Sequence, residues 1–328
     1  MKAYIQEHLQ LVHTELQAVQ RRLQHLLQSE IPIVSELGKY LSNAGGKRFR
    51  PALLLFFYKM ASTQVTRFHP QDDAIEIATL LEMIHMATLA HDDVIDQADQ
   101  RRHQASLPYE WGNRKAVLEG DFIFSRVFKV LNRYEAPIRL KVIEAVEEVL
   151  GGELLQESLR WKVPTEEEYF RVIEGKTASL IAASCALGAM LGDVDLAQSQ
   201  IEEVYNAGMQ LGTAYQMVDD LLDIFGDEQI GKPVWSDRNG GWLTLPFIRL
   251  LEKSSSEEIL PLLLAKTITA HECEFLLEQL QEKGIRDAFF ASARDRVERA
   301  KPLLLWLPES PLKQALFASF NYVIERKL

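Results

Sequence analysis

The sequence has little that would bind nucleic acid, form disulfides or cross a membrane. Its 328 residues include 36 Lys and Arg against 47 Asp and Glu, and the net charge of -11 argues against general nucleic-acid binding. Cys185 and Cys273 are too few for a disulfide framework, and neither has a partner at metal-ligand spacing. The longest apolar run, residues 180–191, is too short for a transmembrane segment, and the N-terminus has no apolar signal core. We therefore expect a cytoplasmic protein.

Strand-like alternation is also scarce, whereas helical spacing recurs in nearly every long segment. Low-complexity tracts and interdomain linkers are absent, so we expect an all-α protein with a single domain over residues 1–328. Heptad spacing of apolar residues from Ile5 to Leu26 predicts an N-terminal amphipathic helix over residues 1–28 that packs on the bundle. Thr165 and Glu168 predict a helix start with a capping box.

One acidic pattern, Asp-Asp-x-x-Asp, occurs twice, in HDDVID and in VDDLLD. On a helix, Asp92 and Asp96 share one face, and so do Asp219 and Asp223. Two unit charges about 4 Å apart repel by about 4 kcal/mol at an effective dielectric of about 20, so carboxylates among apolar residues need a counter-ion. A single such cluster is more often solvated surface. The repeat favours a divalent cation such as Mg²⁺, which is commonly held by one or two carboxylates together with substrate phosphates.

Basic groups are clustered in spite of the negative net charge. The candidates for binding anions are Lys47, Arg48, Arg50, Arg101, Arg102, Lys176, Thr177 and Lys232. Arginine forks suit phosphate oxygens, although each of these side chains alone would more often be solvated or ion-paired. His85 lies seven residues before Asp92, two helical turns back on nearly the same face. A histidine in an apolar helix is usually a core residue, and this placement favours a ligand-binding role instead.

Taken in order, these segments resemble the trans-polyprenyl diphosphate synthases. The matching stretches, from about residue 40 to 250, are GGKRFRP, EMIHMATLAHDDVID, RR, WGNRKAVLEGD, EGKTASL, AYQMVDDLLDIFGD and GKPVWSD. EMIHMATLAHDDVID is most similar to the catalytic subunit of the two-component heptaprenyl or hexaprenyl diphosphate synthases of quinone-making bacteria. The resemblance implies a helical bundle of the isoprenoid synthase type with a central active-site cavity. It also implies a homodimer, or a heterodimer with a small regulatory subunit.

The reaction implied by the resemblance is chain elongation. An allylic diphosphate such as farnesyl diphosphate is extended by successive condensations with isopentenyl diphosphate to a long all-trans polyprenyl diphosphate, used for the side chain of a quinone such as menaquinone. Mg²⁺ on Asp92, Asp96 and Asp219, with Asp223 assisting, draws charge onto the allylic diphosphate so that its carbon–oxygen bond ionises. The enzyme is also expected to contact a membrane transiently when it releases so apolar a product.

The resemblance also assigns roles to individual positions. Isopentenyl diphosphate is expected to bind Lys47, Arg50, His85 and Arg102. The allylic partner is expected to contact Arg101, Lys176, Thr177, Gln216 and Lys232. Gln216 and the Thr177 oxygen are further expected to stabilise the cation by their dipoles. The catalytic set also includes the middle aspartates of the two motifs, Asp93 and Asp220.

Product length is expected to depend on residues one and two turns before Asp92. Ile84 and Thr88 lie eight and four residues before it, with Ala87 alongside. Short-chain members of the family carry a bulky aromatic residue at the position of Ala87, so alanine implies a deep tunnel and a long product. The competing explanation is that small residues merely permit close helix packing.

Two positions depart from the family pattern, and two other functions compete. His103 and Trp235 stand where the family usually has glycine, both in loops that could cover the site. A terpene cyclase shares the first acidic motif, but it would not need Lys47, Arg50 and Arg102, and its second motif usually mixes Asn, Ser and Glu. A non-catalytic helical regulatory subunit would be expected to lose the acidic motifs, and both are intact.

Overall fold

The computed structural model describes residues 8–43, 45–46, 48–62, 65–67, 69–101, 104–226 and 235–325. The regular secondary structure in these ranges is helical apart from one two-stranded antiparallel hairpin, in which β1 (Gln100–Arg101) pairs with β2 (Gln104–Ala105). The prediction of an all-α protein is therefore confirmed.

Contacts along the chain divide it into two compact units. Unit 1 consists of Met1–Val146, Leu180–Gly208 and Leu303–Ser319, and unit 2 consists of Glu147–Ser179, Met209–Pro302 and Phe320–Leu328. Helices α8 (Ala136–Ser158), α11 (Gln198–Phe225) and α17 (Pro311–Glu325) each contribute residues to both units. A single domain over residues 1–328 stays a prediction.

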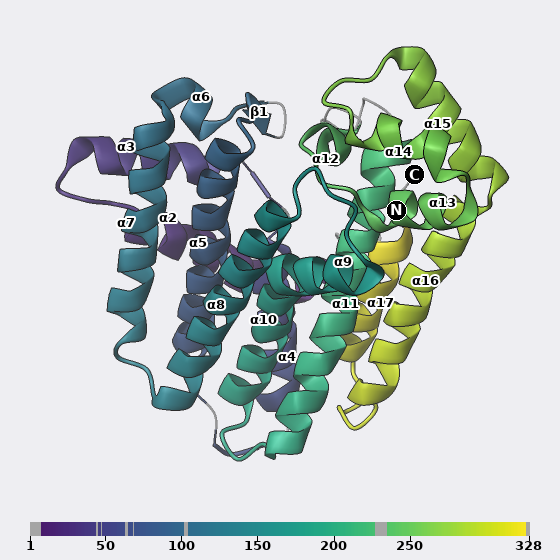
Figure 1. Ribbon diagram of the computed structural model, residues 1–328. Helices are drawn as coiled ribbons and strands as arrows, with labels where there is room; N and C mark the ends of the chain where they lie inside the picture. Colours follow the sequence, from purple (N-terminus) through teal and green to yellow (C-terminus); the bar gives the residue numbers. More distant parts are fainter. Residues whose placement is uncertain are drawn as a thin grey trace. The chain divides into compact units, whose positions relative to one another are not determined.

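Unit 1 is built around the long helix α5 (Figure 1). Its helices are η1 (Gln10–Val12), α2 (His13–Leu26), α3 (Pro32–Asn43), α4 (Phe49–Ser62), α5 (Gln71–Ile95), α6 (Leu107–Trp111), α7 (Asn113–Leu131) and most of α10 (Ser179–Gly192). Helices α2, α4 and α7 all contact α5. The heptad seam of α2 faces inward, because Val19, Leu23 and Leu26 are buried.

Helix α10 lies directly against α4 in unit 1. A Cβ added at Gly188 would come within 2.2 Å of the Leu54 carbonyl oxygen, so only glycine permits this approach. The continuous helical segment Glu166–Gly192 is long and apolar enough to cross a membrane by length and composition, but 83% of its most apolar window is buried inside the protein. Such burial is typical of a core helix in a soluble protein.

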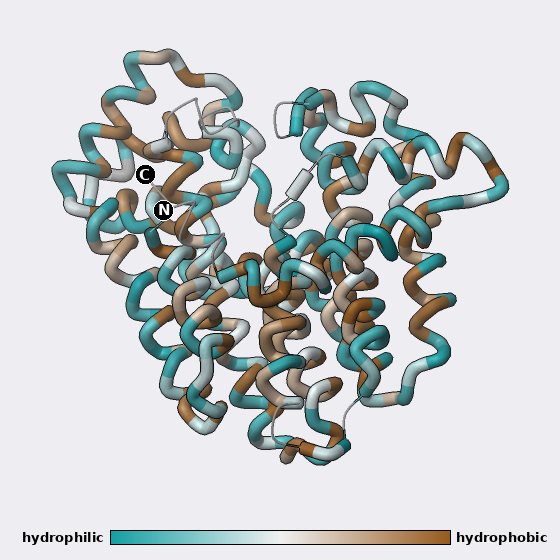
Figure 2. Tube along the Cα trace, turned by 180° about the vertical axis from the view of Figure 1, so that it is seen from behind, coloured by the Kyte–Doolittle hydropathy of each residue, from teal (hydrophilic) through white to brown (hydrophobic). Residues whose placement is uncertain are grey.

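Unit 2 has its own apolar core. Its helices are α9 (Glu166–Ile173), the π-helical segment η2 (Glu174–Ala178), α12 (Ser236–Asn239), α13 (Leu245–Lys253), α14 (Ser256–Leu264), α15 (Ala270–Glu282) and α16 (Ile285–Ala300), and η4 (Lys301–Leu304) extends into unit 1. Trp235, Phe247, Leu263 and Leu276 belong to this core. Hydrophilic and hydrophobic residues alternate along most helices, as expected where one face packs inward (Figure 2).

Helix α9 begins as the sequence predicts. The Thr165 hydroxyl accepts a hydrogen bond from the Glu168 N–H (3.1 Å), and the Glu168 carboxylate accepts one from the Thr165 N–H (2.8 Å). This capping box fixes the start of the helix that carries Tyr169 toward the interior.

Candidate active site

The first acidic motif ends helix α5, where its aspartates point in different directions. Asp96 is the C-cap residue and is exposed, Asp92 is half-buried, and Asp93 is only 2% exposed. Asp93 forms an ion pair with Arg101, at 2.6 Å from Nη2 and 2.7 Å from Nε. Burial raises the pKa of Asp93, and the hydrogen bond and charge of Arg101 oppose that rise. The carboxylates that reach solvent are therefore Asp92 and Asp96, while Asp93 holds strand β1 against α5.

A small cavity of about 30 Å³ lies behind this motif in unit 1. It is lined by Leu41, Gly45, Arg48, Glu82, His85, Met86, Leu89, Asp93 and Arg101. Three predicted site residues, His85, Asp93 and Arg101, are therefore brought together around one space. A cavity of this size has room for only a few water molecules.

Arg48, one of the candidate anion-binding residues, and Glu82, which the sequence analysis did not single out, also line this cavity. Arg48 Nη1 donates to Glu82 Oε1 at 2.7 Å, and Nη2 donates to Gln20 Oε1 at 2.9 Å and to the Ser42 carbonyl at 3.2 Å. The backbone of Arg48 is left-handed, with φ 50°, which is unfavourable for a residue with a side chain. The buried ion pair thus ties the loop before α4 to α5. The available signal was Glu82 within the otherwise uncharged stretch from Ile77 to Ile84.

Of the remaining residues expected to bind isopentenyl diphosphate, the structure describes only Arg50. Arg50 lies in the first turn of α4 and is half-buried. Lys47 and Arg102 lie outside the described residues, as does the departure His103.

The second acidic motif lies in the part of α11 that belongs to unit 2. Asp219 and Asp223 are half-buried and four residues apart, whereas Asp220 is 1% exposed. The Asp223 carboxylate accepts hydrogen bonds from the Ser236 N–H (3.0 Å), the Ser236 hydroxyl (2.5 Å) and the Asp237 N–H (3.2 Å). It therefore caps α12 as well as facing the same side as Asp219. An ionised carboxylate has about four acceptor positions, so capping does not preclude a metal contact.

The packing of Trp235 explains how this departure from the family pattern is tolerated. Its φ of 68° is in the left-handed region, where glycine is the residue normally found. A non-glycine residue there costs about 1–2 kcal/mol. The Trp235 side chain is 4% exposed and packs on Phe247 at 5.4 Å between ring centroids, which offsets this cost. The Trp235 backbone N–H also donates to the Asp223 backbone carbonyl at 2.8 Å, so the tryptophan is bonded directly to the backbone of the second motif.

Asp220 anchors a buried chain of hydrogen bonds in unit 2. It accepts from the Tyr169 hydroxyl at 2.5 Å and from Gln216 Nε2 at 2.8 Å, and the Thr177 hydroxyl donates to Gln216 Oε1 at 2.9 Å. Burial raises the pKa of Asp220, and these two hydrogen bonds oppose that rise. The structure thus brings together three predicted residues, Thr177, Gln216 and Asp220. Tyr169 was missed, because nothing in its local sequence indicates a partner in α11.

Lys176 and Thr177 lie in the π-helical segment η2 between α9 and α10. Single turns of π-helix inside α-helices are rare and frequent at functional sites. The segment lies directly on α8, where a Cβ at Gly152 would come within 2.4 Å of the Lys176 backbone nitrogen. Lys176 Nζ forms an ion pair with Glu153 Oε2 at 2.6 Å. The close approach of Gly152 to the backbone of Lys176 therefore fixes the position of the π-helical segment on α8. Lys232, the other predicted lysine of the allylic set, lies outside the described residues.

Comparison with known proteins identifies the family. The family model for polyprenyl synthetases matches residues 31–280. The chain belongs to the polyprenyl synthetase family. It is 32% identical to "Heptaprenyl diphosphate synthase component 2" of Bacillus subtilis over 96% of this chain and 89% of the relative. It is also 32% identical to the octaprenyl diphosphate synthase of Escherichia coli over 97% of both chains.

Solved structures confirm the fold of the isoprenoid synthase type. A polyprenyl synthase from Caulobacter crescentus, complexed with calcium and isoprenyl diphosphate, superimposes with a TM-score of 0.90 at 27% identity, covering 99% of this chain and 98% of that one. A decaprenyl diphosphate synthase from Rhodobacter capsulatus gives a TM-score of 0.89 at 30% identity, covering 98% and 99%. The chain is accordingly a trans-prenyltransferase, and its family acts on allylic and isopentenyl diphosphates. The terpene cyclase and the regulatory subunit are not favoured.

The acidic motifs of this synthase supply carboxylate oxygens, the kind of ligand that hard divalent cations take. Among the residues that the structure describes, no group of three or more His, Cys, Asp or Glu side chains lies close enough to form a metal site by itself. Magnesium keeps several waters and is usually held by one or two carboxylates plus substrate phosphates. Each motif offers one such pair, Asp92 with Asp96 and Asp219 with Asp223.

The residues expected to set product length lie in the middle of α5. Ile84 and Ala87 are fully buried, and Thr88 is half-buried with its hydroxyl donating to the His85 carbonyl at 2.9 Å. Their position on the helix of the first acidic motif agrees with their assigned role, which stays a prediction.

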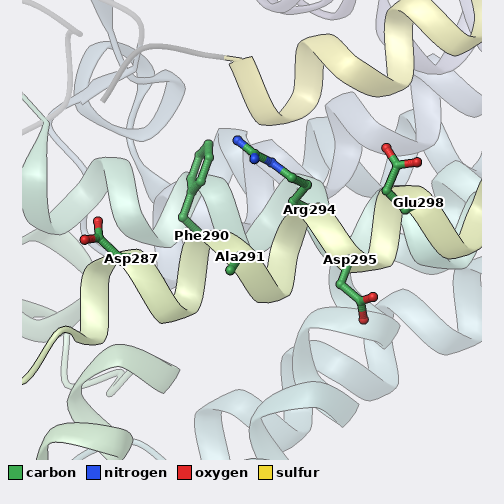
Figure 3. A pocket seen from close by; sticks show the side chains of 6 residues that line it. All are labelled: Asp287, Phe290, Ala291, Arg294, Asp295 and Glu298. Carbon is green, nitrogen blue, oxygen red and sulfur yellow. The ribbon is translucent and has the colours of Figure 1, made fainter.

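A larger hollow, of about 370 Å³, lies along helix α16 and has a different character (Figure 3). All six lining side chains, Asp287, Phe290, Ala291, Arg294, Asp295 and Glu298, come from that one helix. None of them belongs to a motif of the synthase. We therefore assign the chemistry to the motif residues and not to this surface.

Proposed function

We propose that the protein is a magnesium-dependent polyprenyl diphosphate synthase that makes a long all-trans product. One observation carries the proposal: both copies of Asp-Asp-x-x-Asp leave the first and last aspartates at least partly accessible and bury the middle one. This is the arrangement expected if the outer pairs bind divalent ions and the middle carboxylates support neighbouring residues. The relative crystallised with calcium and isoprenyl diphosphate supports the use of a divalent metal.

The outer pairs, Asp92 with Asp96 and Asp219 with Asp223, would hold the ions. Magnesium bound there would neutralise the diphosphate of the allylic substrate and so favour its departure. Arg101 and Lys176, with Lys232, bind that diphosphate. Arg50 and His85, with Lys47 and Arg102, bind isopentenyl diphosphate, whose double bond attacks the allylic cation. The oxygens of Thr177 and Gln216 present negative dipole ends to the cation.

We further propose that the product contains at least about seven isoprene units and becomes the side chain of a quinone. We also propose that the enzyme is cytoplasmic. The support is the names of the relatives, which include heptaprenyl, octaprenyl and decaprenyl diphosphate synthases. Ala87 in place of a bulky residue fits a long product.

We propose that the protein acts as a dimer, either with a second copy or with a small regulatory subunit. Unit 1 exposes apolar side chains on α7 and on its part of α8, namely Val117, Leu118, Phe128, Leu140 and Ile143. Where such side chains form a contiguous patch they mark an interaction surface, and we propose that the partner binds here. The name of the Bacillus subtilis relative, a "component 2", supports a two-component arrangement. Light scattering of the purified chain distinguishes a homodimer from a monomer that needs a partner.

The decisive experiment incubates the purified chain with Mg²⁺, farnesyl diphosphate and labelled isopentenyl diphosphate, and sizes the product by chromatography. We expect Asp92→Ala and Asp219→Ala each to lower kcat by about 100-fold or more, because each removes electrostatic stabilisation of the leaving diphosphate. Asp72→Ala, an exposed aspartate in the first turn of the same helix α5, is the matched control and should retain wild-type turnover. Near-normal activity of either motif variant would contradict the metal-binding role.

A further inference from the structure

Tyr169 is a buried tyrosine in α9 whose hydroxyl points to the second acidic motif. We infer that Tyr169 is a positioning residue: through Asp220 it fixes the amide orientation of Gln216, and so directs the lone pairs of Thr177 and Gln216 toward the allylic cation. The inference rests on the proposed function, because it assumes that these two oxygens face the cation. It adds a residue outside the motifs.

The Tyr169 ring has little freedom to move. It is fully buried, stacks on Trp242 with ring centroids 6.2 Å apart and an interplanar angle of 11°, and meets the edge of Phe170 at 5.3 Å. Its hydroxyl therefore has one direction available, toward Asp220 Oδ2 at 2.5 Å. Burial and the negative charge of Asp220 both raise the pKa of Tyr169, so the hydroxyl keeps its proton.

The hydrogen bonds along this chain have a defined direction. An ionised carboxylate only accepts, so Gln216 must present its amide nitrogen to Asp220 Oδ1, at 2.8 Å. The Gln216 carbonyl then faces the Thr177 hydroxyl, which donates to it at 2.9 Å. The orientation of the amide thus follows from the acceptor at Asp220.

This direction determines which atoms remain for the substrate. Because the Thr177 hydrogen is engaged by Gln216, both lone pairs of Thr177 Oγ1 are left to face another group. The Gln216 carbonyl keeps one lone pair as well. If the amide turned over, an N–H would replace this carbonyl and would repel a carbocation. The chemistry of the proposed reaction therefore depends on the orientation of a single amide.

The Tyr169 hydroxyl also satisfies the second oxygen of Asp220. Asp220 is 1% exposed, and its Oδ2 accepts from the tyrosine while its Oδ1 accepts from Gln216. Phenylalanine cannot donate a hydrogen bond, so Tyr169→Phe would leave Oδ2 buried without this donor.

The first test is Tyr169→Phe, which removes one oxygen and keeps the ring. We expect kcat to fall about tenfold, the size expected for one lost hydrogen bond to a charged group, with KM for both substrates nearly unchanged. The matched control is Tyr58→Phe in unit 1, where a buried hydroxyl donates to the His69 carbonyl at 2.9 Å. That variant loses a comparable hydrogen bond and should keep wild-type kcat. A wild-type kcat in Tyr169→Phe would overturn the inference.

A double-mutant cycle with Gln216→Leu separates positioning from general destabilisation. If Tyr169 acts through the amide, adding Tyr169→Phe to Gln216→Leu should lower kcat by less than about twofold. The same tenfold loss in both backgrounds would show a role independent of Gln216 and would refute the inference. If Gln216→Leu alone retains wild-type kcat, the proposed role of Gln216 fails first and the inference fails with it. A reduced kcat in Gln216→Leu beside a normal Tyr169→Phe would refute the inference alone.

Should Tyr169→Phe fold poorly, as judged by circular dichroism, Asp220→Asn provides a second test. The asparagine offers both a donor and an acceptor, so the orientation of Gln216 is no longer specified. We expect a lower kcat with unchanged KM values. An unchanged kcat in this variant would equally overturn the inference.

Discussion

Gly152 in α8 lies where two backbones approach too closely for any side chain, and its neighbour Gly151 does not. A Cβ added at Gly152 would lie 2.4 Å from the Lys176 backbone nitrogen and 3.0 Å from the Gly175 carbonyl carbon. The same addition at Gly151 meets nothing within 4 Å. The pair Gly152→Ala and Gly151→Ala therefore tests whether the position of the π-helical segment matters for turnover, with chemically identical substitutions at adjacent residues.

The magnitude follows from the distances. Ordinary contacts begin near 3.4 Å, so the π-helical segment and α8 must separate by about 1 Å to admit the methyl group. Overpacking of this kind costs about 1–3 kcal/mol, partly offset by about 1 kcal/mol because alanine favours helix over glycine. A displacement of about 1 Å at reacting groups can lower the rate about 100-fold. We thus expect Gly152→Ala to lose much more activity than stability.

The assay combines kcat with the thermal unfolding midpoint of each variant. Gly151→Ala should have wild-type kcat and an equal or higher Tm, because it gains about 1 kcal/mol of helix propensity at an exposed position. Gly152→Ala should remain folded at the assay temperature with kcat about 100-fold lower. Wild-type turnover in Gly152→Ala would refute the reasoning, since the added methyl group must move Lys176 or α8. Equal losses in both variants would show that the glycines act on the helix generally.

Two further predictions concern α5 and α7. Ala87→Phe and Thr88→Phe should each shorten the product while leaving the first condensation intact, and an unchanged chain length in both variants by chromatography would remove the tunnel assignment. Burial raises the pKa of Glu119 from 4.5 to about 7, so the folded state holds a proton that the unfolded state has lost, and stability should fall as pH rises from about 4.5 to 7. Glu119→Gln should abolish this dependence and be the more stable protein at pH 8, by up to about 3 kcal/mol in urea unfolding; parallel curves for the two proteins would contradict it.

Local sequence rules account for the elements that depend on neighbouring residues. The capping box of Thr165 and Glu168 formed as predicted, because both partners lie within one turn. Helical spacing likewise predicted that Asp92 and Asp96 share a face. The same spacing puts Asp93 about 100° away from Asp92 around the helix, which agrees with its burial.

The features that the sequence did not reveal depend on residues distant in the chain. Tyr169 reaches Asp220 across 51 positions, and the π-helical segment follows from contact between Gly152 and the backbone of Lys176. Arg48 takes a left-handed backbone conformation while its guanidinium is held by Glu82, 34 positions away. No window of a single sequence contains both partners of such contacts. The family resemblance indicated the motifs, but not the buried residues that hold them.

The two acidic motifs bury their aspartates in the same pattern, which the sequence of the motifs alone does not show. In each, the outer aspartates lie on one helix face and the middle aspartate turns inward, where it holds a side chain assigned to the allylic substrate: Arg101 for Asp93 and Gln216 for Asp220. A buried carboxylate without such a partner would be costly, so the partner and the aspartate each need the other. Substitution of a middle aspartate by asparagine should therefore act mainly on the orientation of its partner, and substitution of an outer aspartate mainly on metal binding. The metal dependence of the rate separates the two: a raised Mg²⁺ requirement is expected for Asp92→Asn, and a lowered rate at saturating Mg²⁺ for Asp93→Asn.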